Sequence, residues 1–157
     1  MFAAAVATLT EGVDALAGID ASGLGIADQL RLLDVLETAK RRLTAASHTV
    51  ALAAAKADVA TVMTKAIADR IRVTPAEMRR RLRDADQLAP RTTLIGEPLP
   101  AELPVTSLAW HSGNLDCEHI RLIQKFVRDL PNEIAPDVVA DSESFLAFHA
   151  QQLRPDQ

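Results

Sequence analysis

The sequence has little aromatic content: it contains no tyrosine, one tryptophan and four phenylalanines, so aromatics make up 3% of its 157 residues. β-Strands are enriched in aromatic and β-branched side chains, and this composition therefore argues against an extensive sheet. Alanine, the strongest helix former, occurs 28 times. We predict an all-α fold in the form of a multi-helix bundle.

Export and membrane signals are also lacking. Cys117 is the only cysteine, so no intramolecular disulfide can form, and nothing indicates an oxidising compartment. No lysine or arginine precedes Arg31, whereas a secretory signal begins with a basic segment. No uncharged apolar run reaches the ~18 residues that a spanning helix needs. We expect a cytoplasmic protein without a membrane partner.

The most regular pattern belongs to a long helix that we expect to begin at Asp28, a suitable N-cap residue. Apolar residues follow at alternating spacings of four and three, at Leu32, Leu36, Ala39, Leu43, Ala46, Val50, Ala53, Ala57 and Ala60. This Ala/Leu-rich heptad seam predicts a helix that packs closely in the bundle. A shorter helix up to Ala17 and a glycine-containing linker precede it, so we divide the chain into residues 1–27 and 28–157.

Two further helices form a predicted helix-turn-helix-like hairpin over residues 61–71 and 75–88. Thr74 and Glu77 match a capping box, and Pro75 fits the first helical position, where its missing N–H is not needed. Ala68 is expected at the helix crossing, and Met78 is expected to anchor the second helix.

The hairpin is strongly basic although the whole chain has a net charge of −4. From Arg70 to Arg83 there are six arginines and one acid. The outer face of the second helix and the turn supply our candidate DNA-binding residues, which are Arg72, Arg79, Arg80, Arg83 and Gln87. Arginine neutralises phosphates and pairs with guanine edges, so double-stranded DNA is one candidate partner. A solvated helix face or a protein interface explains the same pattern.

The rest of the chain predicts a proline-rich connection from Pro90 to Pro104 and helices over about 105–111, 116–130 and 137–153. Asp116 is expected to cap the second of these helices. Trp110 is expected to anchor a core or an interface. For the last helix we expect one face to contain Val138, Ser142 and Phe145, together with Phe148 or His149.

No arrangement of residues supports catalysis. His111, Asn114 and His119 lie within nine positions, whereas the His-Asn-His motif of metal-dependent endonucleases spreads over ~30 residues of hairpin and helix. Adding Cys117 does not give zinc-ligand spacing. We expect half-exposed histidines in this segment, and a surface or boundary position for His48. Phosphate-binding glycine loops and nucleophile-elbow motifs are absent. We therefore expect no enzyme activity, no metal and no cofactor.

Three segments carry a family resemblance: Val73-Thr74-Pro75-Ala76-Glu77-Met78-Arg79-Arg80-Arg81-Leu82, Leu115-Asp116-Cys117-Glu118-His119-Ile120-Arg121-Leu122-Ile123 after a glycine turn, and Leu130-Pro131. From about residue 28 onward the chain resembles the mycobacterial thirteen-E-twelve repeat family, an actinobacterial helical domain of unknown function that commonly precedes an HNH endonuclease domain. The resemblance implies a link to mobile or phage-related DNA. It also implies that this chain is the N-terminal, truncated part of the domain, because the nuclease histidine and asparagine have no counterpart here.

These observations lead to one main hypothesis and two alternatives. The main hypothesis is a non-catalytic accessory module of an HNH-endonuclease-associated family that contacts DNA through the Arg-rich helix. The first alternative is an interaction or oligomerisation module, in which the seam from Leu36 to Ala60 pairs with a helix of another copy or of a missing C-terminal half. The second is a truncated relic without independent function.

Overall fold

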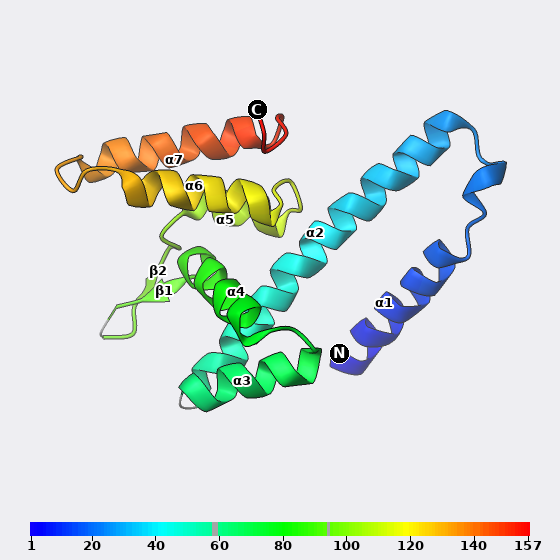
Figure 1. Ribbon diagram of the computed structural model, residues 1–157, viewed down its shortest axis with the longest axis horizontal. Helices are drawn as coiled ribbons and strands as arrows, with labels where there is room; N and C mark the ends of the chain where they lie inside the picture. The colour runs from blue at the N-terminus through cyan, green and yellow to red at the C-terminus, as the bar shows by residue number, and fades with distance from the viewer. Residues whose placement is uncertain (58–59, 94) are drawn as a thin grey trace. The chain divides into compact units, whose positions relative to one another are not determined.

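The structure is a computed structural model that describes residues 1–57, 60–93 and 95–157, and most of these residues are helical (Figure 1). In that part of the chain the only strands are β1 (Arg91–Thr92) and β2 (Pro98–Leu99), which form an antiparallel pair. The predicted all-α class is confirmed. The chain divides into two compact units, residues 1–36 and residues 37–157, and each is described by itself.

Unit 1 contains α1 (Phe2–Ala17), the short 3-10 helix η1 (Ala21–Gly23) and the beginning of α2 (Ile26–Lys56). None of the α1 side chains is buried. The Asp20 carboxylate caps η1 by accepting a hydrogen bond from the backbone N–H of Ser22 at 3.0 Å.

The predicted N-cap of the long helix is wrong. Helical hydrogen bonding begins before Asp28, because the carbonyl of Gly25 accepts from the N–H of Gln29 at 3.0 Å. Asp28 consequently lies in the first turn of α2. Its carboxylate still stabilises the helix there, since the N-terminal end of a helix carries partial positive charge.

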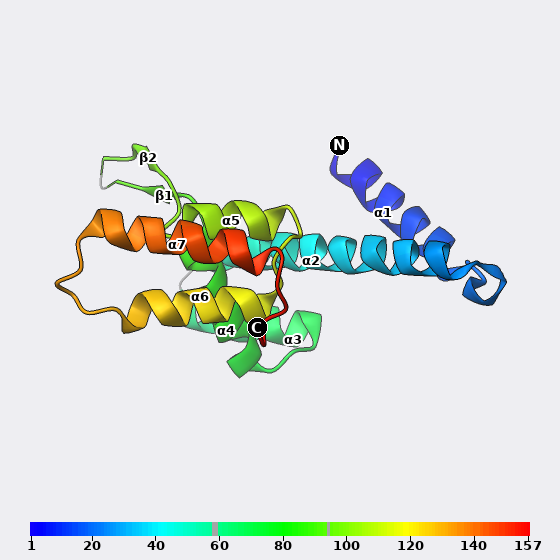
Figure 2. The ribbon, with the colours of Figure 1, turned by 90° about the horizontal axis from the view of Figure 1, so that it is seen from above.

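Unit 2 contains the rest of α2 followed by five helices, which are α3 (Ala60–Ile71), α4 (Pro75–Leu88), α5 (Pro104–His111), α6 (Cys117–Asp129) and α7 (Pro136–Ala150). Figures 1 and 2 both show α6 and α7 side by side, with α5 against them. The predicted cap of α6 is confirmed, because the Asp116 carboxylate accepts from the N–H groups of Glu118 at 2.7 Å and His119 at 3.1 Å.

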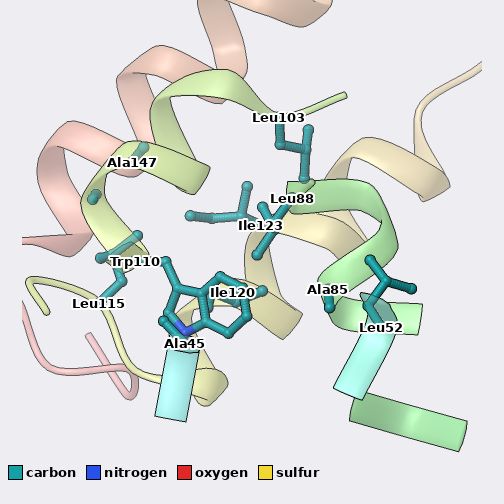
Figure 3. Close-up of a cluster of buried hydrophobic side chains, with 11 residues drawn as sticks. Ala45, Leu52, Ala85, Leu88, Leu103, Trp110, Leu115, Ile120, Ile123 and Ala147 are labelled. Carbon is teal, nitrogen blue, oxygen red and sulfur yellow. The ribbon is translucent and has the colours of Figure 1, made fainter. Parts of the chain in front are cut away.

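The core of unit 2 surrounds Trp110, which is 1% exposed. Figure 3 shows its indole between Ala45 of α2 and Ile120 of α6, near Leu115. Other members of the cluster come from α4 and α7, so five helices contribute to one hydrophobic core. The sequence-based expectation that Trp110 anchors a core or an interface is confirmed, and the site is the core.

The face that α2 turns to this core differs from the prediction. Its buried residues are Ala45, His48, Ala51 and Leu52. The predicted seam faces the other way: Leu43 is 44% exposed and Val50 is 69% exposed. The seam was also predicted to continue through Ala57 and Ala60, but α2 ends at Lys56, and the side chain of Ala60 lies outside the described residues. Because alanines lie on both faces of α2, both faces have apolar residues at helical spacing. Periodicity alone therefore predicted the wrong face as the buried one.

The same error affected His48, which we expected at a surface or boundary position. It is 4% exposed, and its ring lies 5.5 Å from the indole of Trp110 in an edge-on arrangement. Burial, together with the positive charge of Arg81, lowers the pKa of His48 from 6.5 to about 4. The imidazole is therefore neutral inside the core at neutral pH.

Helix α7 turns its phenylalanines away from the core. Phe145 is 64% exposed and Phe148 is 58% exposed, whereas Glu143 and Ala147 are buried. Glu143 is turned inward because its carboxylate accepts two hydrogen bonds of 2.6 Å from Thr106, one from the backbone N–H and one from the hydroxyl. These donors lie in the first turn of α5, where backbone N–H groups lack helical partners. A buried carboxylate thereby joins α7 to α5.

A glycine turn after α5 holds that helix against α2. Gly113 has a φ of +83°, a conformation that favours glycine. A Cβ atom at this position would lie 2.8 Å from the carbonyl oxygen of Thr38 and 2.7 Å from Cγ of Arg42. The backbone of the turn therefore approaches α2 more closely than any other residue would permit.

The proline-rich connection is more ordered than expected. Its two short strands are joined by a turn in which the N–H of Thr93 donates to the carbonyl of Glu97 at 2.8 Å. Gly96 closes the turn with a φ of +87°. Among the described residues, no helix has the length and apolar character needed to cross a membrane.

Candidate nucleic-acid interface

Backbone hydrogen bonds hold the turn between α3 and α4. At the end of α3 the N–H of Val73 donates to the carbonyl of Ala68 at 3.0 Å, and the N–H of Arg72 donates to the carbonyl of Asp69 at 3.3 Å. This pair of bonds is the usual way to end a helix with one residue in the left-handed region, most often glycine. Here that residue is Arg72, with a φ of +59°. The arginine is held in a backbone conformation that costs it about 1 kcal/mol relative to glycine.

Helix α4 begins where the sequence predicts. The hydroxyl of Thr74 accepts from the N–H of Glu77 at 3.1 Å, and Pro75 occupies the first turn. Only this half of the capping box forms. The Glu77 carboxylate binds the guanidinium groups of Arg80 and Arg81 instead, the latter at 2.8 Å. The hydrogen bond from Arg81 holds the pKa of Glu77 below its usual value, so this carboxylate keeps its negative charge beside the two arginines.

The inner side of the hairpin is a small apolar cluster. Ala68 of α3 and Met78 of α4 are both fully buried, and Ala51 of α2 packs with them. Val73 in the turn and Leu82 on α4 pack against this cluster. The predicted helix-turn-helix-like hairpin, with Ala68 at the crossing and Met78 as an anchor, is confirmed as a structural unit.

The predicted DNA-binding residues divide into two groups. Arg72, Arg79 and Arg83 are exposed, and none of them forms an ion pair with another described residue. Arg80 is half-buried and paired with Glu77. Gln87 is half-buried as well. Three arginines of the hairpin therefore present unpaired charge to solvent, whereas Arg80 and Gln87 lie at the edge of this surface.

A groove of about 660 Å³ lies between α4 and α6. Its basic lining residues are Arg80 and Arg83 of α4 with Arg121, Lys125 and Arg128 of α6. Asp129 lies beside the α6 cations and binds Lys125 at 2.7 Å and Arg128 at 3.3 Å. Arg121 is exposed and forms no ion pair with any described residue. It is therefore the one α6 cation of the groove whose charge is unpaired.

Acidic side chains limit the positive charge in this groove. Asp84 is 8% exposed, and burial raises the pKa of its carboxyl group. Asp86 binds Lys56 at 2.7 Å, and Glu102 completes the acidic lining. Unpaired positive charge is consequently found on the outer face of α4 and in the turn, and in the groove it comes from Arg83 and Arg121.

Sequence reasoning missed Arg121, because it treated the hairpin as a separate unit. The contribution of α6 depends on tertiary packing across about 40 residues, which local patterns do not report. One signal was available: Arg121, Lys125 and Arg128 recur at spacings of four and three, and would lie on one face of a helix.

The histidines near the second turn have structural partners. His119 is 7% exposed, contrary to the expected half-exposed position, and its Nε2 lies 3.0 Å from the carbonyl of Leu153. His111 is exposed, with Nδ1 2.8 Å from the carbonyl of Ser107. Burial raises the pKa of the Cys117 thiol. Within the described ranges, no three His, Cys, Asp or Glu side chains come together in a group that could hold a metal ion.

Comparisons with known proteins point to one family. The model of "Domain of unknown function (DUF222)" matches residues 30–157. The chain is 32% identical to the uncharacterised protein Rv1128c of Mycobacterium tuberculosis over 157 residues, which cover 98% of this chain and 35% of that protein. It is 36% identical to the uncharacterised protein Mb1179c of Mycobacterium bovis over 131 residues, which cover 81% of this chain and 29% of that protein. The chain thus spans about a third of the length of these curated relatives. No solved structure matches it.

Proposed function

The chain belongs to the family of the domain of unknown function DUF222, and we propose that it acts as a non-catalytic helical module that contacts double-stranded DNA through the α3–α4 hairpin. The observation that carries this proposal is the exposure of Arg79 and Arg83 on the outer face of α4, with Arg72 exposed in the adjoining turn, on a hairpin whose other side is buried. Unpaired arginines on a rigid helix are suited to phosphate contact, because their positions do not depend on flexible loops.

Electrostatics explain how an acidic chain would still bind DNA. The chain as a whole carries −4, but the segment from Arg70 to Arg83 carries an excess of positive charge. At physiological salt, charges more than about 8 Å apart are strongly screened. A phosphate at the hairpin is therefore attracted mainly by Arg79, Arg83 and the nearby turn, and Arg121 extends this surface onto α6.

The proposal also includes a nuclease domain as the functional partner of the module. The sequence resembles the thirteen-E-twelve repeat family, whose helical domain commonly precedes an HNH endonuclease domain and is linked to mobile DNA. The curated relatives are about three times as long as this chain, which leaves room for such a domain. In this proposal the helical module holds the DNA and the hydrolysis takes place elsewhere.

The test is fluorescence anisotropy with labelled mixed-sequence duplex DNA over a salt series. We expect the wild type to bind with an affinity that falls steeply with salt, because each neutralised phosphate releases counterions. The Arg79→Ala/Arg83→Ala variant should bind more weakly, and the slope of log affinity against log salt should decrease by about 2. Neither side chain is buried, so the variant should keep the wild-type helicity.

A matched control removes two arginines elsewhere. Arg31→Ala/Arg154→Ala lowers the net charge equally but leaves the hairpin intact, and it should bind DNA like the wild type. If the control loses as much affinity as the hairpin variant, the binding is a nonspecific effect of net charge. Absence of binding by folded wild type at low salt would refute the proposal and favour a protein partner.

A further inference from the structure

We propose that the exposed apolar face of α2 binds a second copy of this chain, with the two α2 helices antiparallel. The α2 seam is defined here as Leu36, Ala39, Leu43, Ala46, Val50 and Ala53. Its three large side chains are between 39% and 69% exposed. Its alanines are exposed except for Ala39, which is half-buried. A row of apolar side chains left largely exposed on one face of a helix is typical of an interaction surface.

The seam is separate from the face that α2 already uses. At 100° per residue, the seam lies opposite Ala45, His48 and Leu52, which are the α2 residues packed into the core of unit 2. Helix α2 is thus apolar on two faces, of which only one is buried in unit 2. None of the exposed hairpin arginines belongs to the seam, so pairing through α2 does not depend on the proposed DNA contact.

The order of large and small residues determines the direction of pairing. Along the seam a large residue alternates with alanine: Leu36, Leu43 and Val50 occupy one heptad position, and the three alanines occupy the other. In a parallel pair, equivalent positions meet, so layers of two large residues would alternate with layers of two alanines. In an antiparallel pair, each large residue meets an alanine of the other copy, so every layer has the same width and the helices can approach closely.

The flanking charges select one antiparallel register. When Leu43 faces Ala46 of the second copy and Val50 faces its Ala39, Lys40 lies beside Ser47 and Arg42 lies beside Thr49 of that copy. No like charges are then opposed. A shift by one heptad in one direction places Lys40 beside Lys40 and Arg42 beside Arg42. The opposite shift places Arg42 beside Lys56. Opposed like charges destabilise a coiled coil, so the first register is favoured.

The size of the seam predicts a reversible association. Seventeen residue steps separate Leu36 and Ala53, which gives a contact about 26 Å long. One pair of helices of this length forms a small interface compared with the ~1,600 Å² of a stable complex. We therefore expect monomer and dimer to exchange, with the dimer fraction rising with protein concentration.

Sedimentation velocity over a concentration series tests the proposal. The wild type should shift toward a dimer as concentration increases, and Val50→Lys should weaken the dimer by about tenfold or more, because each copy would bury a charge. The matched control is Leu108→Lys: Leu108 is 71% exposed and Val50 is 69% exposed, so the same charge enters at the same exposure. The control should dimerise like the wild type. A wild type that stays monomeric, or equal behaviour of the two variants, would overturn the proposal.

Mixing two variants tests the direction and the register. Val50→Glu alone and Ala39→Lys alone should each be largely monomeric. In the antiparallel register, an equimolar mixture brings the introduced carboxylate of one variant against the introduced ammonium group of the other, and leaves the second such contact native. We expect the mixture to form a heterodimer more tightly than either variant forms a homodimer. If mixing does not increase association, the antiparallel register is refuted.

Discussion

Replacing Glu143 by alanine tests how strongly unit 2 depends on one buried carboxylate. The side chain is 2% exposed and accepts two hydrogen bonds of 2.6 Å from Thr106, which is fully buried. A hydrogen bond to a charged group contributes about 1.5–3 kcal/mol, and truncation leaves both buried donors unpaired. Among the described residues no lysine or arginine forms an ion pair with Glu143, so desolvation of the carboxylate offsets part of this gain. We expect Glu143→Ala to lower the free energy of unfolding by about 3 kcal/mol.

Urea denaturation followed by circular dichroism measures this change. Glu133→Ala is the control, because Glu133 is exposed in the loop between α6 and α7, and its replacement should change the free energy of unfolding by less than about 0.5 kcal/mol. Thr106→Val removes the hydroxyl donor and keeps the N–H donor, so it should cause about half of the loss. A loss below about 1 kcal/mol for Glu143→Ala would show that the carboxylate does not stabilise the contact between α5 and α7.

The remaining predictions concern the hairpin and the core. Arg72→Gly should stabilise the protein by about 1 kcal/mol in urea denaturation, since glycine tolerates a positive φ, and should also weaken DNA binding; unchanged stability would contradict the proposed strain. Thr74→Ala should lower the free energy of unfolding in urea by about 1 kcal/mol, because it removes the cap of α4; an unchanged value would contradict this role of the cap. The His48 ring should titrate near pH 4 by NMR. Because folding lowers its pKa, the contribution of the neutral His48 ring to the free energy of unfolding is fully present above about pH 6.5 and is lost as the pH falls toward 4. A His48 midpoint near 6.5 would contradict this burial.

The starts of α4 and α6 were predictable because they depend on neighbouring residues, although the start of α2 was placed too late. Thr74 and Pro75 define the start of α4 within one turn, and Asp116 does the same for α6. These side chains satisfy backbone groups in their own helix, so no knowledge of the tertiary structure is needed. The packing of Ala68 against Met78 also followed from sequence, because the hairpin connection is short and brings them together.

The orientation of helices was harder to predict, since it depends on distant partners. The buried face of α2 was assigned to Leu43 and Val50, whereas the core instead receives Ala45 and His48. On α7 the phenylalanines lie on an exposed face, whereas Glu143 is inside because Thr106, 37 residues earlier, supplies two donors. A buried polar residue with a distant partner gives no local signal, and a hydrophobicity pattern assigns it to the surface.

The burial of Trp110 has a practical consequence for spectroscopy. The sequence has no tyrosine and no other tryptophan, so the near-ultraviolet fluorescence of this protein originates in the core of unit 2. The emission of Trp110 will therefore report the melting of the core of unit 2. The ring of His48 lies 5.5 Å away, and a protonated imidazole quenches indole emission, so acid titration of the folded protein should dim this single fluorophore as His48 takes up its proton.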